Sequence, residues 1–131
     1  MSYYSNTKHA MFSLQYEFVF CSRYTRKLFL DPRLNQRFLE ITDDVCREQG
    51  FRLIFCEIHD YWVHLRLEAS PELSPSDILT KIRYRTSKLL RDEFEFIQHL
   101  PSLWTRKYLV STKPLEKETV ELFLQAQKKR G

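Results

Sequence analysis

The segment Asp60-Tyr61-Trp62-Val63-His64-Leu65-Arg66-Leu67 decides the fold of this chain, because its side chains alternate in character. Apolar residues fall at positions 63, 65, 67 and 69, and other residues fall between them. A period of two is typical of a β-strand that has one face in a core. We therefore predict a strand over residues 61–69, whose second face presents Trp62, His64, Arg66 and Glu68.

The segments on either side of this strand alternate between strand-like and helix-like patterns. Alternating apolar residues predict a strand over 12–20, and aromatic and branched residues predict strands over 51–58 and 103–111. Asp31-Pro32 and Ser74-Pro75 each place a capping oxygen before a proline and so predict two helix starts. Gly50 predicts the end of the first helix, and residues 114–127 predict a short amphipathic helix.

The resulting order, β-α-β-β-α-β-α, predicts an α+β fold of the ferredoxin-like type. We expect an antiparallel β-sheet with helices packed on one face. The length of 131 residues suits a single domain over 1–131, with residues 1–11 as a flexible N-terminus. With only two glycines, the chain has no glycine-rich phosphate loop.

The compartment is predicted from what the sequence contains. No apolar run approaches the roughly 20 residues that span a bilayer, and no secretory segment follows Met1. Three irregularly spaced cysteines predict thiols in a reducing environment and not a disulfide framework. We therefore expect a cytoplasmic protein without a membrane partner.

The net charge of +4 is unevenly distributed along the chain. Basic residues gather over 23–37, 81–91 and 106–113, whereas acidic residues gather over 40–48 and 92–95. Such segregation indicates a surface that faces a polyanion. Solvated helix faces also carry charge runs, so charge alone leaves both interpretations open.

Five segments, in order and with matching spacing, resemble the HUH single-tyrosine transposases of the IS two-hundred/six-hundred-five insertion-sequence family. These transposases mobilise DNA through single strands. The resemblance lies in residues 16–27 of the first strand, in 60–67 of the third strand and in the basic helix over 85–94. It continues in the strand over 103–112 and in Phe123-Leu124-Gln125-Ala126-Gln127 on the last helix.

The resemblance implies a metal site and a nucleophile, of which this chain retains only part. In the family, two histidines and a glutamine hold Mg²⁺ or Mn²⁺, and a tyrosine attacks the scissile phosphate. His64 and Gln127 match two of the metal ligands. Trp62 stands in place of the other histidine, and an indole N–H has no lone pair for a cation. Phe123 stands in place of the tyrosine and has no oxygen to form the covalent bond.

We therefore expect a transposase-like protein that binds hairpin or single-stranded DNA as a homodimer, with strand cleavage lost and no bound cofactor. Pro114 replaces part of a glycine hinge, which makes movement of the last helix doubtful. Trp62 is expected either to pack over the vacated site or to stack on a base. The alternatives are an active transposase with a rerouted site and a regulatory protein without a DNA role. The expected DNA-binding residues are Arg23, Tyr24, Arg26, Lys27, Arg83, Arg85, Lys88, Arg106 and Lys107.

Overall fold

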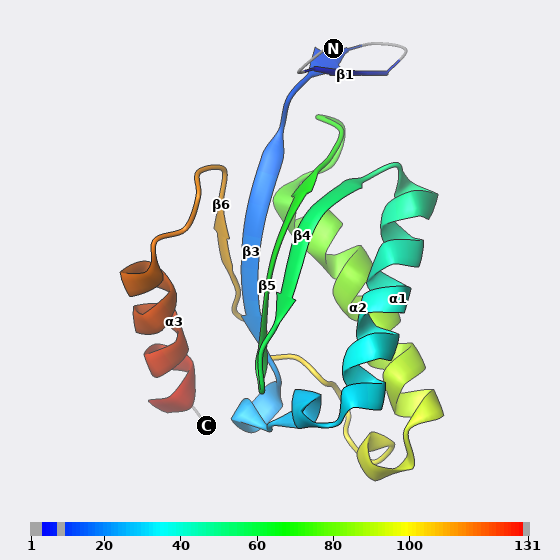
Figure 1. The fold of residues 1–131 in the computed structure, drawn as a ribbon, viewed down its shortest axis with the longest axis vertical. Helices are drawn as coiled ribbons and strands as arrows, with labels where there is room; N and C mark the ends of the chain where they lie inside the picture. Colours follow the sequence, from blue (N-terminus) through cyan, green and yellow to red (C-terminus); the bar gives the residue numbers. More distant parts are fainter. Residues whose placement is uncertain (1–3, 8–9, 130–131) are drawn as a thin grey trace.

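The computed structural model describes residues 4–7 and 10–129 and contains a four-stranded antiparallel sheet. The strand order is β4-β5-β3-β6 (Figure 1). The strands are β3 (Gln15–Cys21), β4 (Arg52–Ile58), β5 (Trp62–Glu68) and β6 (Leu109–Ser111). This is the order expected for a ferredoxin-like arrangement, so the predicted α+β class and antiparallel sheet are confirmed.

The first two helices begin where the capping residues predict. The carboxylate of Asp31 accepts a hydrogen bond from the backbone N–H of Arg33 at 2.9 Å, and α1 (Pro32–Gln49) follows. Gly50 ends α1 in the left-handed region at φ 75°. The Ser74 hydroxyl accepts from the backbone N–H of Asp77 at 3.1 Å at the start of α2 (Pro75–Glu93). Each cap satisfies a backbone donor that the helix leaves free.

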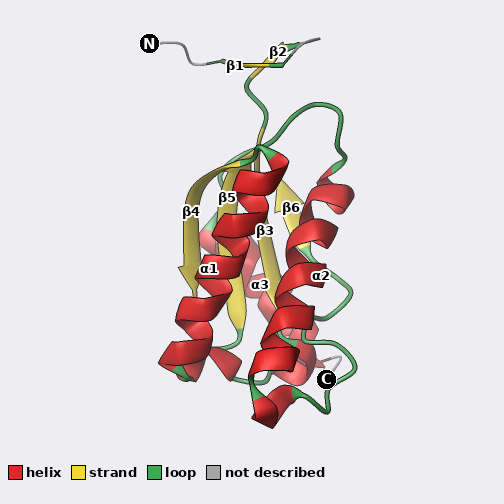
Figure 2. Ribbon diagram, turned by 90° about the vertical axis from the view of Figure 1, so that its right-hand side faces the viewer, coloured by secondary structure: helices red, strands yellow, loops and turns green. Residues whose placement is uncertain are grey.

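Helices α1 and α2 lie side by side on one face of the sheet (Figure 2). Phe18 and Phe20 of β3, with Val63, Leu65 and Leu67 of β5, are fully buried beneath them. These apolar residues are the ones whose alternation predicts the two strands. The main core therefore lies between this face and the helix pair.

The third helix, α3 (Lys117–Lys129), lies on the opposite face of the sheet from α1 and α2 (Figure 1). The expectation of helices on one face thus holds for two of the three. The physical reason is that Val19 and Cys21 make the second face of β3 apolar as well. Val120 and Leu124 of α3 bury these residues in a second, smaller apolar cluster.

The segment before α3 is less regular than predicted. Only Leu109–Ser111 form strand β6, whereas a strand over 103–111 was expected. Trp104 turns into the main core, where its indole N–H donates to the Thr86 hydroxyl at 3.1 Å. A buried indole needs such a partner. The backbone of Trp104 still forms an isolated antiparallel bridge with Ser22, so the pairing expected over 103–111 is interrupted between this bridge and β6.

Near the N-terminus, β1 (Ser5–Asn6) pairs with β2 (Met11–Phe12) in a separate two-stranded ladder. Residues 1–3 and 8–9 of the terminus predicted to be flexible lie outside the described residues. Within residues 4–7 and 10–129, no helix is both long and apolar enough to cross a membrane.

Candidate functional site

Glu17 organises the sheet face beneath α3. Its side chain is only 5% exposed, and its Oε1 lies 2.7 Å from Nε2 of His64 on the neighbouring strand. Arg66 donates to the other oxygen at 2.8 Å, and the backbone N–H of Leu115 donates to Oε1 at 3.1 Å. Burial raises the pKa of Glu17, but the hydrogen bonds from His64 and Leu115 and the nearby charges hold it below its ordinary value. We call Glu17, His64 and Arg66 the Glu17 network.

The two retained ligand positions are not brought together. His64 lines a cavity of about 360 Å³ under α3, whereas Gln127 lines a different cavity of about 460 Å³. The Nε2 atom of His64 is already hydrogen bonded to Glu17. Among the described residues, no cluster of three or more His, Cys, Asp or Glu side chains could hold a metal ion. The donor set implied for Mg²⁺ or Mn²⁺ therefore does not fit this arrangement.

Trp62 and Phe123 both pack against the second apolar cluster, which consists of Val19, Cys21, Tyr61, Val120 and Leu124. The indole of Trp62 also stacks on the ring of His59, with centroids 3.7 Å apart and planes 7° from parallel. Of the two expectations for Trp62, the structure contains the packing arrangement. The two positions that the resemblance assigns to a metal ligand and a nucleophile are thus filled by side chains in a hydrophobic contact.

The linker from β6 to α3 is tied to the sheet at several points. Besides the bond from Leu115 to Glu17, Arg66 approaches the carbonyl oxygen of Thr112 at 3.4 Å. The backbone N–H of Lys113 donates to the Ser111 hydroxyl at 3.0 Å. These contacts hold the segment around Pro114 against its own sheet.

A second cavity, of about 460 Å³, forms where the end of β3, α2, the segment before β6 and α3 meet. We call it the basic pocket. Five of the nine predicted DNA-binding residues line it, and no carboxylate is among its lining residues in the described chain. The complete lining is Arg23, Tyr24, Arg83, Ser102, Trp104, Thr105, Arg106, Lys107 and Gln127.

Tyr24 stands at the mouth of this pocket in an unusual turn, η1 (Arg23–Thr25). Its φ angle is 61° and that of Thr25 is 50°, a left-handed conformation that costs energy for side chains other than glycine. The Ser22 hydroxyl helps to hold the turn by donating to the carbonyl oxygen of Arg26 at 2.5 Å. The Tyr24 ring is 55% exposed, and the guanidinium groups of Arg23 and Arg26 lie 5.6 and 5.7 Å from its centroid. An exposed ring flanked by cations suits stacking on a nucleobase.

The other predicted DNA-binding residues, Arg26, Lys27, Arg85 and Lys88, do not line the basic pocket. Arg85 instead pairs with Glu48 of α1 at 2.8 Å, and the hydrogen bond to that carboxylate raises the pKa of Arg85. Lys27 and Lys88 are exposed, and the guanidinium of Arg26 lies beside the Tyr24 ring. The basic clusters seen in the sequence are therefore divided between different surfaces.

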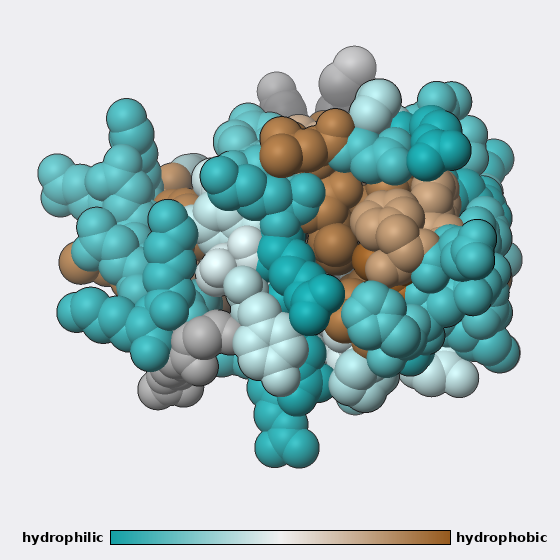
Figure 3. Space-filling view, turned by 90° about the horizontal axis from the view of Figure 1, so that it is seen from below, coloured by the Kyte–Doolittle hydropathy of each residue, from teal (hydrophilic) through white to brown (hydrophobic). Residues whose placement is uncertain are grey.

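The end of the molecule that carries η1 and the last turns of α3 appears in Figure 3, viewed from below. Hydrophilic side chains surround a hydrophobic area on this face. Exposed Leu30 of η2 (Leu28–Leu30) and Phe96 of η3 (Glu95–Ile97) lie at the same end of the fold. Polar and apolar surface are thus both available here.

Neither Glu17 nor His59 was predicted from the sequence as a residue of this site. Glu17 occupies a polar position in an alternating strand, which suggests a solvent-facing side chain. The available signal was that Val19 and Cys21 share its face, because apolar residues on both faces of a strand indicate that both are covered. His59 carried no signal beyond its place in the tight connection before β5.

Comparison with known proteins agrees with this fold. The family described as "Transposase IS200 like" matches residues 10–127. The chain is 24% identical over 107 residues to transposases for insertion sequence element IS200 from Salmonella typhimurium (strain LT2) and Salmonella typhi. The matched region covers 79% of this chain and 70% of each relative.

Two solved structures share the fold. A crystal structure described as a transposase from Deinococcus radiodurans R1 matches with a TM-score of 0.81 and 18% identity, covering 94% of this chain and 97% of that one. A REP-associated tyrosine transposase bound to a REP hairpin matches with a TM-score of 0.60 and 13% identity, covering 93% and 68%. Since the family match spans nearly the whole sequence, this chain belongs to the IS200-like transposase family.

Proposed function

We propose that this chain binds hairpin or single-stranded DNA and does not cleave it. The proposal rests on a contrast between two places in the fold. One is the pair of positions, 62 and 123, where DNA cleavage would need a metal ligand and a nucleophile. The other is the basic pocket. Trp62 and Phe123 are packed into an apolar cluster, whereas the pocket keeps four cationic side chains and an exposed tyrosine beside them. The first arrangement lacks a nucleophile, and the second suits a nucleic acid strand.

DNA binding is supported by the chemistry of the basic pocket. Arg23, Arg83, Arg106 and Lys107 can neutralise phosphates, and Tyr24 can stack on an unpaired base. The structural relative that is bound to a REP hairpin supports a folded single strand as the ligand class. Arg85 is not part of this surface, because its charge is paired with Glu48.

Loss of cleavage is supported by what surrounds the two altered positions. A phenyl ring at 123 cannot form a phosphotyrosine bond. Restoring a metal site would require His64 and Gln127 to approach each other, because they line different cavities. The pinned linker argues further against a swing of α3 that would bring these groups together.

The alternative of a rerouted nucleophile has little structural support. Tyr61 is buried in the second apolar cluster, where the ammonium of Lys128 lies 5.2 Å from its ring centroid. Tyr108 is half-buried against the main core, and Arg83 lies 5.8 Å from its ring centroid. Both tyrosines are therefore already engaged in packing contacts.

The experiment is to incubate the unmodified chain with a stem-loop oligonucleotide and Mg²⁺ or Mn²⁺. We expect a non-covalent complex whose affinity falls with increasing salt, and no labelled DNA on the protein after denaturing electrophoresis. A covalent adduct or a cut strand would establish an active transposase. Absence of salt-dependent binding would favour a regulatory role without DNA.

We also infer a homodimer. Strands β4 and β6 are the edges of the sheet among the described residues, and an open edge invites pairing with another chain. Leu122 on α3 is exposed and offers additional apolar surface. Light scattering at micromolar concentration should give the mass of two chains; the mass of one chain would contradict the inference.

A reducing compartment, such as the cytoplasm, is in keeping with the state of the three free cysteines. Burial raises the pKa of Cys21 and of Cys56 to about 12, and that of Cys46 to about 11. These thiols stay protonated at neutral pH and are poor nucleophiles. They fit a role in packing and not in chemistry.

A further inference from the structure

Two buried side-chain nitrogens of the basic pocket have no hydrogen-bond partner among the described residues. They are Nε2 of Gln127 and Nη1 of Arg83. Gln127 is 4% exposed although it lies on the last turns of α3. Buried polar atoms in proteins are nearly always hydrogen bonded, so two orphaned donors that line one cavity require an explanation.

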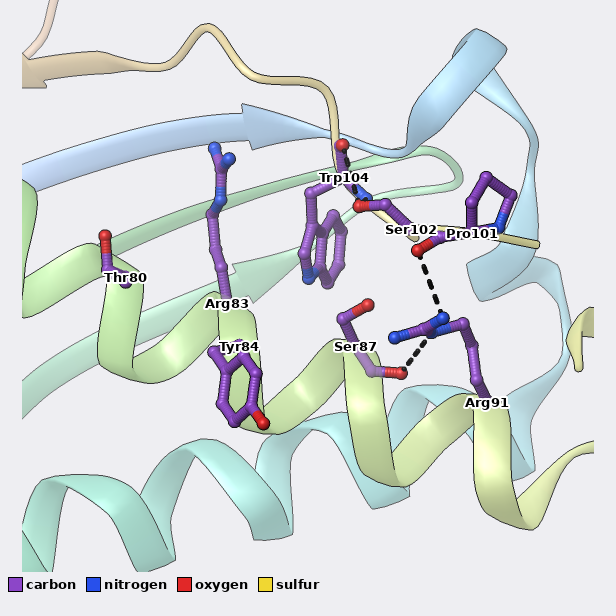
Figure 4. Close-up of a pocket in the computed structure, with 8 residues that line it drawn as sticks. All are labelled: Thr80, Arg83, Tyr84, Ser87, Arg91, Pro101, Ser102 and Trp104. Atoms are coloured by element: carbon purple, nitrogen blue, oxygen red, sulfur yellow. Dashed lines mark hydrogen bonds between the residues drawn. The ribbon is translucent and has the colours of Figure 1, made fainter.

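Arg83 differs in this respect from Arg91, which lies two turns further along α2. Figure 4 shows both in a neighbouring cavity of about 380 Å³. The guanidinium of Arg91 donates to the carbonyl oxygens of Ser87, Leu100 and Pro101 at 3.0 to 3.1 Å, so it serves the fold. Arg83 extends beside Trp104 and lies 5.8 Å from the ring centroid of Tyr108, and among the described residues its guanidinium makes one long hydrogen bond, 3.5 Å to the carbonyl oxygen of Arg106. Its hydrogen-bonding capacity is largely unused.

The lining of the basic pocket selects the ligand's charge. Arg23, Arg83, Arg106 and Lys107 bring four cationic groups, and no carboxylate lies among them to neutralise that charge. Such surroundings repel a divalent cation and attract an anion. An arginine guanidinium and an amide N–H are both donors that suit the oxygens of a phosphate.

We propose that the basic pocket binds a phosphate group, with Arg83 and Gln127 as its buried donors. Gln127 would then serve as a ligand for an anion, in place of the cation that the resemblance implies. The inference rests on the proposed DNA-binding function and deepens it. Because both nitrogens are buried, the two side chains must turn toward the phosphate. The bonds from the guanidinium to the phosphate oxygens would be charge-assisted and therefore stronger than neutral hydrogen bonds.

The test uses the full chain and inorganic phosphate as the probe. Phosphate should raise the thermal unfolding midpoint in a concentration-dependent manner, because a ligand that binds only the folded state stabilises it. Arg83→Met and Gln127→Met should each abolish this rise. The matched controls are Arg85→Met on α2, whose charge is paired with Glu48, and Gln125→Met on the exposed side of α3. Both controls should keep the rise.

A second readout separates binding from folding. Without phosphate, Gln127→Met should unfold at the same temperature as the unmodified chain or higher, because it removes an unsatisfied buried donor. A lower midpoint would mean that the amide supports the fold, and the proposal would fail. Retention of the phosphate effect by both pocket variants would also overturn it.

Competition with DNA identifies the source of the phosphate. If the phosphate belongs to a DNA backbone, a stem-loop oligonucleotide should displace inorganic phosphate, and Arg83→Met should weaken its binding roughly tenfold or more. If the two bind together, the ligand is a free phosphate. No response to phosphate with normal oligonucleotide binding would refute the pocket alone. A phosphate response without oligonucleotide binding would refute the DNA-binding function alone.

Discussion

The Glu17 network and the basic pocket lie in one small fold, but they differ in how far their buried polar groups are hydrogen bonded. In the network, both oxygens of Glu17 accept hydrogen bonds, and α3 with its linker covers the site. In the pocket, Arg83 and Gln127 keep donors that nothing in the described chain satisfies. The comparison teaches that one fold can complete the hydrogen bonds of one buried polar group and leave those of another open, and only the second group has capacity for a ligand.

The largest expected effect comes from removing the centre of the network. Glu17→Ala leaves His64, Arg66 and the backbone N–H of Leu115 without their acceptor, so the free energy of unfolding should fall by about 3–5 kcal/mol. Urea denaturation measures this loss. Glu57→Ala is the matched control, because its carboxylate is 60% exposed and lies 3.8 Å from His64. Equal effects for the two variants would remove the distinction between a buried network and a surface contact.

Tyr24→Ala tests the opposite region. Removal of the ring should weaken single-stranded DNA binding by about 1–3 kcal/mol, the usual range for one stacked base. Phe96→Ala, which removes another exposed ring at the same end, should leave affinity unchanged. Fluorescence anisotropy with a labelled oligonucleotide gives both values. Similar losses for the two variants would indicate nonspecific contact with the apolar area.

Combined Arg106→Ala and Lys107→Ala should flatten the salt dependence of DNA binding. Each phosphate contact contributes about 0.7 to the slope of log affinity against log salt for a single strand, so the slope should fall by about 1.4. Arg85→Ala should keep the original slope because Glu48 already neutralises that charge. A change for Arg85 equal to that of a pocket residue would contradict the assigned surface.

The Glu17 network should also account for part of the loss of folding stability at low pH. Because the folded-state pKa of Glu17 lies below its ordinary value of 4.5, its ionisation stabilises the fold above that pH. This contribution is lost as pH falls from 4.5 through the lower folded-state value. Glu17→Gln should therefore show a smaller decline in stability over this range than the unmodified chain. Identical declines, measured by urea denaturation at several pH values, would assign the acid response to other carboxylates.

The smallest expected effect belongs to the combined Trp62→His and Phe123→Tyr variant. We expect no DNA nicking with Mg²⁺ or Mn²⁺, because Gln127 stays in the basic pocket and lines a different cavity from His64. Denaturing electrophoresis of a labelled stem-loop detects any product. A phosphotyrosine adduct would demonstrate that α3 can leave its position and rebuild the metal site.

The parts of the fold that follow from local rules were predictable from the sequence. The caps at Asp31 and Ser74, the stop at Gly50 and the alternation in β5 all lie where the sequence indicates. Val19 and Cys21 signal that the second face of β3 is covered, but the sequence does not say that α3 is the element that covers it. The interruption between Trp104 and β6 was not predictable either, because alternating side chains do not show where the backbone pairing with β3 breaks.

The candidate site was likewise predictable in part. Arg23, Tyr24, Arg83, Arg106 and Lys107 were predicted and do meet in one pocket. Arg85 was grouped with them because it is near Arg83 in sequence, but two residues along a helix point in different directions. Gln127 was assigned to His64 through the resemblance, and only the three-dimensional arrangement places it among the arginines.

The turn at Tyr24 and Thr25 has a consequence for how this protein could be altered. Glycine adopts positive φ angles without steric strain, but it also loses more backbone entropy on folding, so the two effects of a glycine at either position oppose each other. Tyr24→Gly should therefore change stability little, whereas it removes the ring proposed to stack on a base. If the proposed function holds, the strained backbone at this turn is what keeps a flat aromatic surface exposed.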